Sequence, residues 1–198
     1  MEIEYKWDMA DSQLAQSILS SEPVSKAIEV QREIRMEAIY YDTPVRDVYA
    51  MHGGLRIRRE NDTSVCCLKM SAESTEACKT RLEFEVVAQS IEEGLEKLPQ
   101  AGAPQDVCER LLAGEPVPIC STAFTRHECA LACAGFRAEL AFDVGEMHRN
   151  GKTAPIHEIE LEYISGSEGS FHAFAAELEE QFTLIVQPLS KLARAMSL

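Results

Sequence analysis

The chain has 198 residues and a formal net charge of −14 at pH 7, with 19 Lys and Arg against 33 Asp and Glu. Because this length suffices for one domain with a substantial core, we expect residues 1–198 to form a single domain. The acidic balance argues against a nucleic-acid or an anionic-membrane partner. No stretch approaches about 18 consecutive apolar residues and the N-terminus is acidic, which predicts a cytoplasmic protein without a membrane span or a signal peptide.

The chain opens with strict alternation of charged and apolar side chains. Glu2, Glu4 and Lys6 are separated by large apolar or aromatic residues, so a strand would place all three charges on one face. Taken alone, this pattern is that of an ordinary half-buried edge strand with its charges in solvent. A helical apolar stripe follows over residues 9–19, and residues 31–41 alternate again before a proline ends or kinks the strand.

The middle of the chain repeats the alternation. Residues 55–60 place two arginines and a glutamate on one face, and residues 65–70 form the returning strand of a hairpin. Residues 81–86 put an arginine and two glutamates on one face. Apolar residues at helical spacing then predict two short helices, over residues 90–98 and 106–112.

The last third of the chain is predicted to contain further strands and one long helix. Residues 117–136 are expected to form one hairpin that contains Arg126, followed by strands over residues 137–147 and 156–164. Residues 156–164 carry carboxylates at every second position, and the strand before them places Glu139 and Asp143 on one face. A long final helix, with an apolar stripe, is expected to begin near Ser167.

Five segments therefore share one pattern, with charges on one face and large apolar side chains on the other. A closed antiparallel barrel explains both faces, because its lumen would hold the charges, helices would cover its apolar outer wall, and closure removes open strand edges. Carboxylates clustered in a lumen require cations, and Mg²⁺ or Mn²⁺ suits them, whereas Arg and Lys suit phosphate oxygens. The pattern predicts a site for a metal-complexed polyphosphate.

In chain order, these motifs resemble the CYTH domain, or triphosphate tunnel metalloenzyme, family. The resemblance rests on an ExExK sequence at residues 2–6 and on residues 40–44, 54–59, 68–69, 81–85, 126, 139–143, 158–160 and 190–191. It implies an α+β, mainly β fold: an eight-stranded antiparallel tunnel, covered by peripheral helices, that binds a triphosphate with divalent cations. Members of the family include inorganic triphosphatases, thiamine triphosphatases and class IV adenylyl cyclases.

The resemblance also implies roles for individual residues. Basic residues that would hold phosphate oxygens are Lys6, Arg56, Arg58, Lys69, Arg81, Arg126 and Lys191. Carboxylates that would coordinate the main metal ion are Glu2, Glu4, Glu158 and Glu160, and those that would bind a second metal ion or position water are Glu83, Glu85 and Asp143. The catalytic candidates are Lys6, Glu85 and Asp143. For Lys191 an orientation toward solvent is also open, because its segment is expected to be helical.

The function predicted from this reading is metal-dependent hydrolysis of a triphosphate. Inorganic triphosphate is the first choice of substrate, because the alternation places Trp7 on the outer wall, where it cannot stack on a base. The alternatives are a class IV adenylyl cyclase, a thiamine or nucleoside triphosphatase, and a module that binds polyphosphate without turnover. Outward apolar residues that no helix covers would permit a homodimer.

Overall fold

The computed structural model describes residues 3–71 and 81–198. Its strands are β1 (Glu4–Asp8), β2 (Ile28–Asp42), β3 (Gly54–Glu60), β4 (Thr63–Ser71), β5 (Arg81–Val87), β6 (Val117–Cys133), β7 (Phe136–Arg149), β8 (Lys152–Gly166) and β9 (Ile185–Val186). Its helices are α1 (Ser12–Ser20), α2 (Glu22–Ser25), α3 (Asp47–Ala50), α4 (Ile91–Lys97), α5 (Gln105–Ala113), α6 (Glu168–Phe182) and α7 (Lys191–Met196), with a 3-10 turn at Leu98–Ala101. None of the helices in these ranges is long and apolar enough to cross a membrane.

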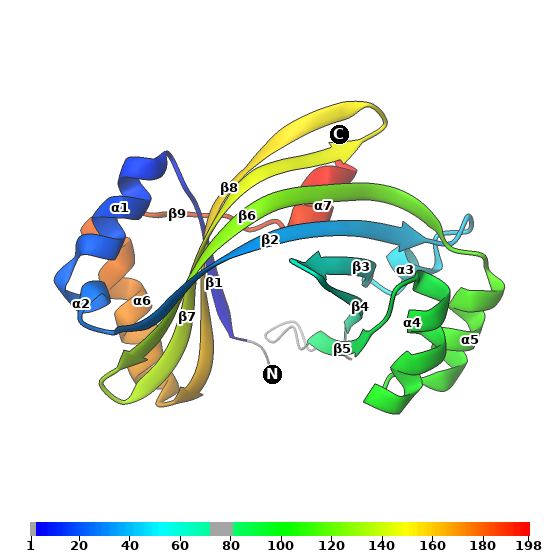
Figure 1. The fold of residues 1–198 in the computed structure, drawn as a ribbon, viewed down its shortest axis with the longest axis horizontal. Coiled ribbons are helices and arrows are strands. Elements are labelled where there is room, and N and C mark those ends of the chain that lie inside the picture. The colour runs from blue at the N-terminus through cyan, green and yellow to red at the C-terminus, as the bar shows by residue number, and fades with distance from the viewer. Residues whose placement is uncertain (1–2, 72–80) are drawn as a thin grey trace.

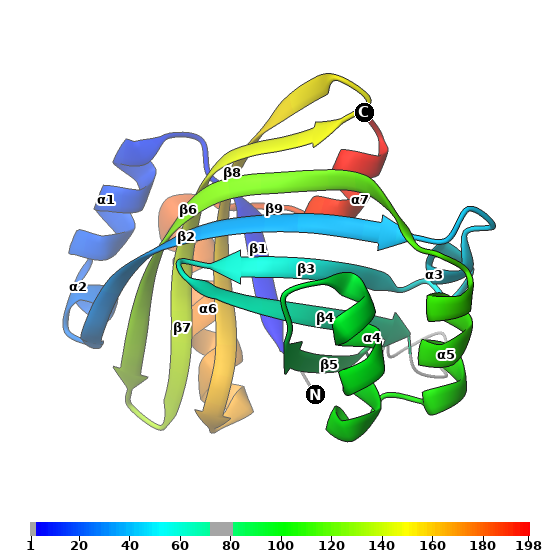
Figure 2. The ribbon, with the colours of Figure 1, turned by 45° about the vertical axis from the view of Figure 1, so that its right-hand side comes forward.

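The described strands form one antiparallel sheet in the order β5-β4-β3-β2-β6-β7-β8-β1-β9. The sheet is strongly curved, and its inner face looks toward the space between β1 and the β3–β5 strands (Figures 1 and 2). The prediction of a mainly β, antiparallel fold with peripheral helices is confirmed. Among the pairings of the described residues, β5 bonds to β4 and β9 to β1, so these two strands stand at the ends of the sheet.

The hairpin predicted over residues 117–136 is wrong. β6 instead runs unbroken from Val117 to Cys133 and pairs along its length with β2 on one side and β7 on the other. Residues 119–133 contain neither Gly nor Pro, so nothing in this segment interrupts the strand. The turn falls at Gly135, whose φ of 93° is a conformation that glycine adopts without steric cost.

Two groups of helices cover the outer face of the sheet. Helices α1, α2 and α6 bury the apolar side chains of β1, β6, β7 and β8 in one core, and α4 and α5 cover β3 and β4 in a second. The described helices leave the middle of β2 open, and there Arg35, Glu37 and Ile39 are exposed. In the middle of β2 the charged residues therefore face solvent, and Ile34 and Met36 face inward. Arg32, nearer the start of the strand, lines the cavity.

Helix α7 lies on the inner side of the sheet. Its Ala195 is fully buried in a cluster with Tyr40 of β2, Met147 of β7 and Ile156 of β8. Ser190 caps the helix by accepting a hydrogen bond from the backbone N–H of Ala193. The C-terminal segment is therefore part of the inner wall and not a covering helix.

The packing of β1 against α6 makes a stability prediction. Trp7, the only tryptophan, is fully buried, stacks on Tyr5 with ring centroids 5.6 Å apart, and donates from Nε1 to Glu179 Oε1 at 2.7 Å. Trp7→Ala is expected to lower the free energy of unfolding by about 3–5 kcal/mol, because it leaves a cavity in the core. Urea denaturation followed by far-UV circular dichroism measures this. Trp7→Phe should cost less, and an equal loss in both variants would contradict the packing argument.

Candidate functional site

A cavity of about 700 Å³ lies against the inner face of the sheet. The predicted site residues that line it are Glu4, Lys6, Arg56, Arg58, Lys69, Glu83, Glu85, Arg126, Glu160 and Lys191. Asp143 and Glu158 are fully buried and are not among the lining side chains. Glu2 and the side chain of Arg81 lie outside the part of the chain that the structure describes.

Strand register brings charged residues from four strands together at one end of the cavity. Arg126 of β6 is the register partner of Asp143 on β7, Asp143 is the partner of Glu158 on β8, and Lys6 of β1 is the partner of Glu160. Because partners across a sheet project from the same face, these side chains meet on the inner side. We call Asp143, Glu158 and Glu160 the carboxylate cluster.

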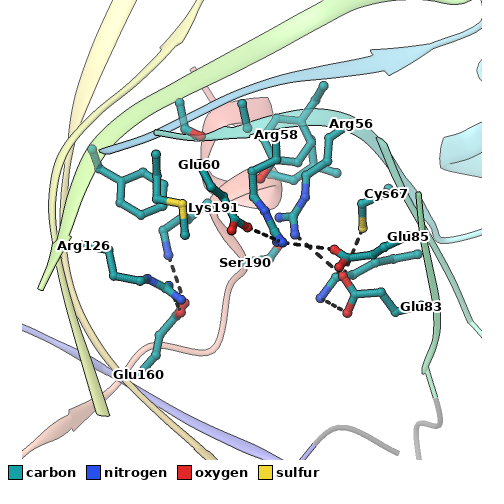
Figure 3. A pocket seen from close by; sticks show the side chains of 18 of the residues that line it. Arg56, Arg58, Glu60, Cys67, Glu83, Glu85, Arg126, Glu160, Ser190 and Lys191 are labelled. Carbon is teal, nitrogen blue, oxygen red and sulfur yellow. Dashed lines mark hydrogen bonds and ion pairs between the residues drawn. The ribbon is translucent and has the colours of Figure 1, made fainter. Parts of the chain in front are cut away.

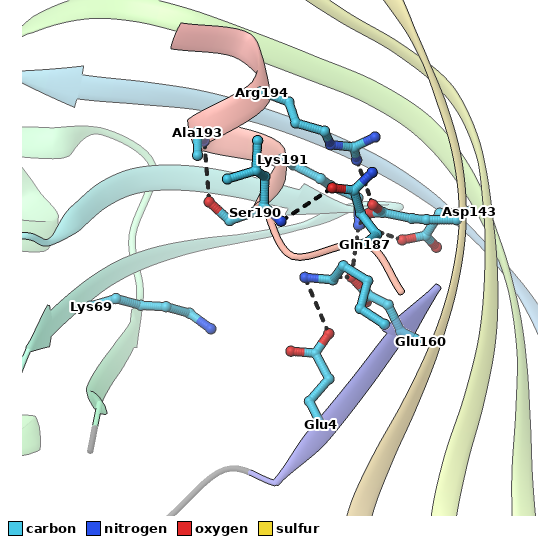
Figure 4. A network of polar contacts seen from close by, with 12 residues as sticks. Glu4, Lys69, Asp143, Glu160, Gln187, Ser190, Lys191, Ala193 and Arg194 are labelled. Atoms are coloured by element: carbon cyan, nitrogen blue, oxygen red, sulfur yellow. Dashed lines mark hydrogen bonds and ion pairs between the residues drawn. The ribbon is translucent and has the colours of Figure 1, made fainter. Parts of the chain in front are cut away.

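Two cations neutralise much of this cluster (Figure 4). Lys191 Nζ lies 2.8 Å from Asp143 Oδ2 and 2.9 Å from Glu160 Oε1, and it also contacts Glu158. Arg126 donates from Nε and Nη2 to the two oxygens of Asp143, both at 2.8 Å, and contacts Glu160 as well. Lys191 thus points into the site, so its alternative orientation toward solvent is wrong.

Burial and the neighbouring cations shift the pKa values of the carboxylate cluster in opposite directions. Burial by itself raises the pKa of Glu160, but the charges of Lys191, Arg126 and Lys6 outweigh it and hold that pKa well below its usual value. Glu158 has its pKa raised by burial in spite of Lys191. The three side chains each offer one carboxylate oxygen, and these atoms lie within 4.8 Å of one another. Such an all-oxygen donor set fits a hard divalent ion such as Mg²⁺ or Mn²⁺.

A second charged group lies at the opposite side of the cavity, on β3, β4 and β5 (Figure 3). Lys69 Nζ lies 2.8 Å from Glu83 Oε2, and Arg56 Nη2 lies 3.7 Å from Glu83 Oε1. Arg58 Nη2 lies 3.2 Å from Glu85 Oε1 and 2.6 Å from Glu60 Oε1. The Nε atoms of Arg56 and Arg58 are buried and have no hydrogen-bond partner. Buried donors without a partner are uncommon in proteins, so these two arginines stand out among the basic residues of this group.

Cys67 belongs to the same group, although it was not predicted as a site residue. Its Sγ donates to Glu83 Oε1 at 3.0 Å, and burial raises the pKa of this thiol to about 12, so it is a donor and not a thiolate. Cys67, Glu83 and Glu85 also offer ligand atoms within 4.8 Å of one another. The signal was present in the sequence, since Cys67 lies two residues before Lys69 and so shares its face of the strand.

An apolar wall separates the two charged groups. It consists of Ile34 and Met36 of β2 and Phe124 of β6, which all line the cavity. Lys191 Nζ lies 4.9 Å from the centroid of the Phe124 ring, so the wall also contacts the first group directly. An apolar surface beside the charges excludes water, which strengthens their interaction with any ionic ligand.

The structure thus has a curved antiparallel sheet with carboxylates and basic side chains interleaved on its inner face. The chain belongs to the CYTH domain family, whose profile matches residues 1–196. The family resemblance predicted from the sequence motifs is thereby confirmed.

Solved structures with this fold cover nearly the whole chain. HpAC1 from Hippeastrum, a candidate adenylyl cyclase with a dominant triphosphatase activity, is 20% identical, with a TM-score of 0.63 over 100% of this chain and 96% of that chain. PH1819 from Pyrococcus horikoshii OT3 is 21% identical, with a TM-score of 0.59 over 100% and 99% of the two chains. A candidate adenylate cyclase from Bacillus halodurans is 16% identical, with a TM-score of 0.58 over 96% and 94%. At these identities the likeness concerns the fold.

The second charged group makes a prediction about pH. Burial raises the pKa of Glu83, but its hydrogen bonds and charge interactions with Lys69, together with Cys67 and Arg56, lower it below 4.5 overall. A carboxylate with a depressed folded pKa stabilises the protein above its unfolded pKa, and this contribution is lost as pH falls through the folded value. The difference in unfolding free energy between wild type and Glu83→Gln should therefore be constant above about pH 5 and shrink below about pH 4. Urea denaturation at several pH values measures it, and a difference that widened on acidification would contradict the assignment.

Proposed function

We propose that the protein is a divalent-metal-dependent triphosphatase and that its substrate is inorganic triphosphate. In this proposal residues 1–198 form a single domain, and the sheet closes around the ligand as an eight-stranded tunnel. The observation that carries the proposal is a cavity with basic side chains on two opposite sides. Two of these side chains, Arg56 and Arg58, have a buried Nε–H donor without a hydrogen-bond partner. A chain of phosphates can contact both sides at once, whereas a single phosphate group contacts one.

The basic residues on the two sides would divide the phosphate chain between them. Arg56, Arg58 and Lys69 hold one end, and Lys6, Arg126 and Lys191 hold the other, with Arg81 assigned to the phosphates by the family resemblance. Each forms charge-assisted hydrogen bonds to phosphate oxygens, which fixes the reacting phosphorus in place. Positioning and electrostatic stabilisation are the main requirements of phosphoryl transfer, so no covalent nucleophile is needed.

The carboxylates would hold the metal ions. Glu4, Glu158 and Glu160, with Glu2, fit the main ion, and Glu83, Glu85 and Asp143 are assigned to a second ion or to water. A bound divalent ion would supply positive charge against the phosphate oxygens as the phosphorus–oxygen bond breaks. Asp143 also accepts from both Arg126 and Lys191, so it orients the two cations that face the substrate. Lys6 lies 3.5 Å from Glu160 and 3.4 Å from Glu4, and we assign it to catalysis as a cation that stabilises negative charge on the phosphates at this end.

A second candidate function is action on an organic triphosphate. The apolar wall of Ile34, Met36 and Phe124 offers a surface to a base or to a thiamine ring. Trp7 supports inorganic triphosphate instead, because the only tryptophan is buried on the outer side of β1 and cannot stack on a ligand. HpAC1, with its dominant triphosphatase activity, is consistent with hydrolysis as the reaction of this fold.

A substrate panel tests the reaction. Purified protein with Mg²⁺ or Mn²⁺ is incubated with inorganic triphosphate, ATP and thiamine triphosphate, and phosphate, pyrophosphate and cyclic AMP are all quantified. We expect fastest release of phosphate from inorganic triphosphate and loss of activity with EDTA. Pyrophosphate and cyclic AMP from ATP would identify a cyclase and overturn the proposal. Tight binding of triphosphate without any product would identify a binding module.

Two substitutions test the proposed roles of the carboxylates as metal ligands and of the arginines as phosphate ligands. Glu4→Gln should abolish metal-dependent turnover and leave the fold intact, because it removes a proposed metal ligand. Arg58→Ala should chiefly weaken substrate binding and raise KM, because it removes a donor to the phosphates. Steady-state kinetics and circular dichroism measure both effects. Glu37→Gln is the matched control: it removes an exposed carboxylate from the outer face of β2, and it should behave as wild type. Full activity of Glu4→Gln would refute the metal assignment.

A further inference from the structure

Helix α7 brings a second cation to the carboxylate cluster. Arg194 lies one helical turn after Lys191 and contacts Glu158, whose side chain is fully buried (Figure 4). The Nε atom of Arg194 is itself buried and has no hydrogen-bond partner. None of the predicted phosphate or metal contacts includes this residue. Its position against Glu158 therefore needs an explanation of its own.

The charges of the cluster balance without a metal ion. Asp143, Glu158, Glu160 and Glu4 provide four negative charges, and the cations paired with them, Arg126, Lys191, Arg194 and Lys6, provide four positive charges. Lys6 joins Glu4 to the cluster, because it lies 3.5 Å from Glu160 and 3.4 Å from Glu4. A divalent ion added to this buried and already neutral group would leave two positive charges uncompensated, which is costly away from water.

The packing of α7 keeps its two cations, Lys191 and Arg194, beside the carboxylate cluster. Ala195 is buried in the inner cluster with Tyr40 and Met147, and Arg149 of β7 donates to the backbone carbonyl of Met196. The segment that leads into the helix is held as well, because the backbone N–H of Gln187 donates to the carbonyl of Lys6 at 2.9 Å. Since α7 is fixed at both ends, charge balance on metal binding must come from an anion that enters the cavity. A triphosphate supplies that negative charge.

We propose that Arg194 is a positioning residue that holds Glu158 and completes the neutralisation of the carboxylate cluster, so that a divalent ion binds weakly alone and tightly together with a triphosphate. This inference rests on the metal site of the proposed function and adds an order of assembly to it. Metal ion and triphosphate each raise the affinity for the other by the same factor, as linkage requires. In this arrangement Arg194 contributes positive charge to the carboxylate cluster but does not face the phosphates.

Mn²⁺ binding tests the inference directly. Binding of Mn²⁺ to the full chain is measured by electron paramagnetic resonance, alone and with a triphosphate analogue whose bridging oxygens are methylene groups, after correction for Mn²⁺ bound by the analogue in protein-free buffer. For the wild type we expect the analogue to raise Mn²⁺ affinity about tenfold or more. For Arg194→Met we expect Mn²⁺ alone to bind about tenfold more tightly than to the wild type, with a smaller effect of the analogue.

Three further variants separate charge from structure. Arg194→Gln removes the charge while it keeps a donor for Glu158, so it replaces Arg194→Met if that variant does not fold. Arg194→Lys keeps the charge and should restore wild-type coupling. Arg35→Met removes an exposed arginine from the outer face of β2, away from the inner side on which α7 lies, and it should bind Mn²⁺ as the wild type does.

The outcomes distinguish this inference from the proposed function. Tight binding of Mn²⁺ alone to the wild type, or the same change in Arg35→Met as in Arg194→Met, would overturn the role of Arg194 and leave the metal site standing. Failure of every protein to bind Mn²⁺, with or without the analogue, would overturn the metal site and the inference together.

Discussion

The compensation of buried carboxylates by basic side chains is the interaction on which this structure depends. Asp143 and Glu158 are fully buried, and a buried carboxylate is tolerated when cations and hydrogen-bond donors surround it. Here the cations come from β6 and from α7, so strands and helix must all be in place before the group is stable. The inner face of the sheet is consequently a binding surface and a source of structural constraint at once.

The two charged groups of the cavity have similar side chains but differ in how closely these side chains are paired. In the group on β3, β4 and β5, Arg56 lies 3.7 Å from Glu83 and Arg58 lies 3.2 Å from Glu85, and both arginines have a buried Nε–H without a hydrogen-bond partner. In the group around the carboxylate cluster, Arg126 and Lys191 both lie 2.8 Å from the fully buried Asp143. The apolar wall lies between these two groups.

Much of this arrangement could be predicted because alternation is a local signal. Period two placed Glu4 and Lys6 on the same face and Trp7 on the other, as the structure has them, and the CYTH motifs identified the family. Local patterns did not suffice where contacts between segments far apart in the chain determine the structure. The alternation of residues 31–41 did not show which face of β2 is the inner one, and in the structure Ile34 and Met36 line the cavity while Glu37 is exposed. The unbroken course of β6 follows from pairing with two long strands, which turn residues alone do not reveal.

Arg194 and Cys67 were missed for different reasons. Cys67 shares the face of Lys69 by local alternation, so its position was predictable although its hydrogen bond to Glu83 was not, whereas the position of Arg194 depends on its contact with Glu158 on another element. The spacing of Arg194 from Lys191 was visible, but the face of α7 that meets the sheet depends on the packing of Ala195. A search for basic residues one turn from a predicted phosphate ligand would have found it.

The pairing of β1 with β8 has a consequence for the order in which the protein is made. Strand β1 is synthesised before residues 158–162, its partner in the sheet, and before α7, which begins at Lys191. More than 150 residues separate Glu4 from Glu162, its register partner, and contacts between such distant segments form slowly. During synthesis the cavity is therefore completed only after α7 has emerged, which makes its formation a late event in folding.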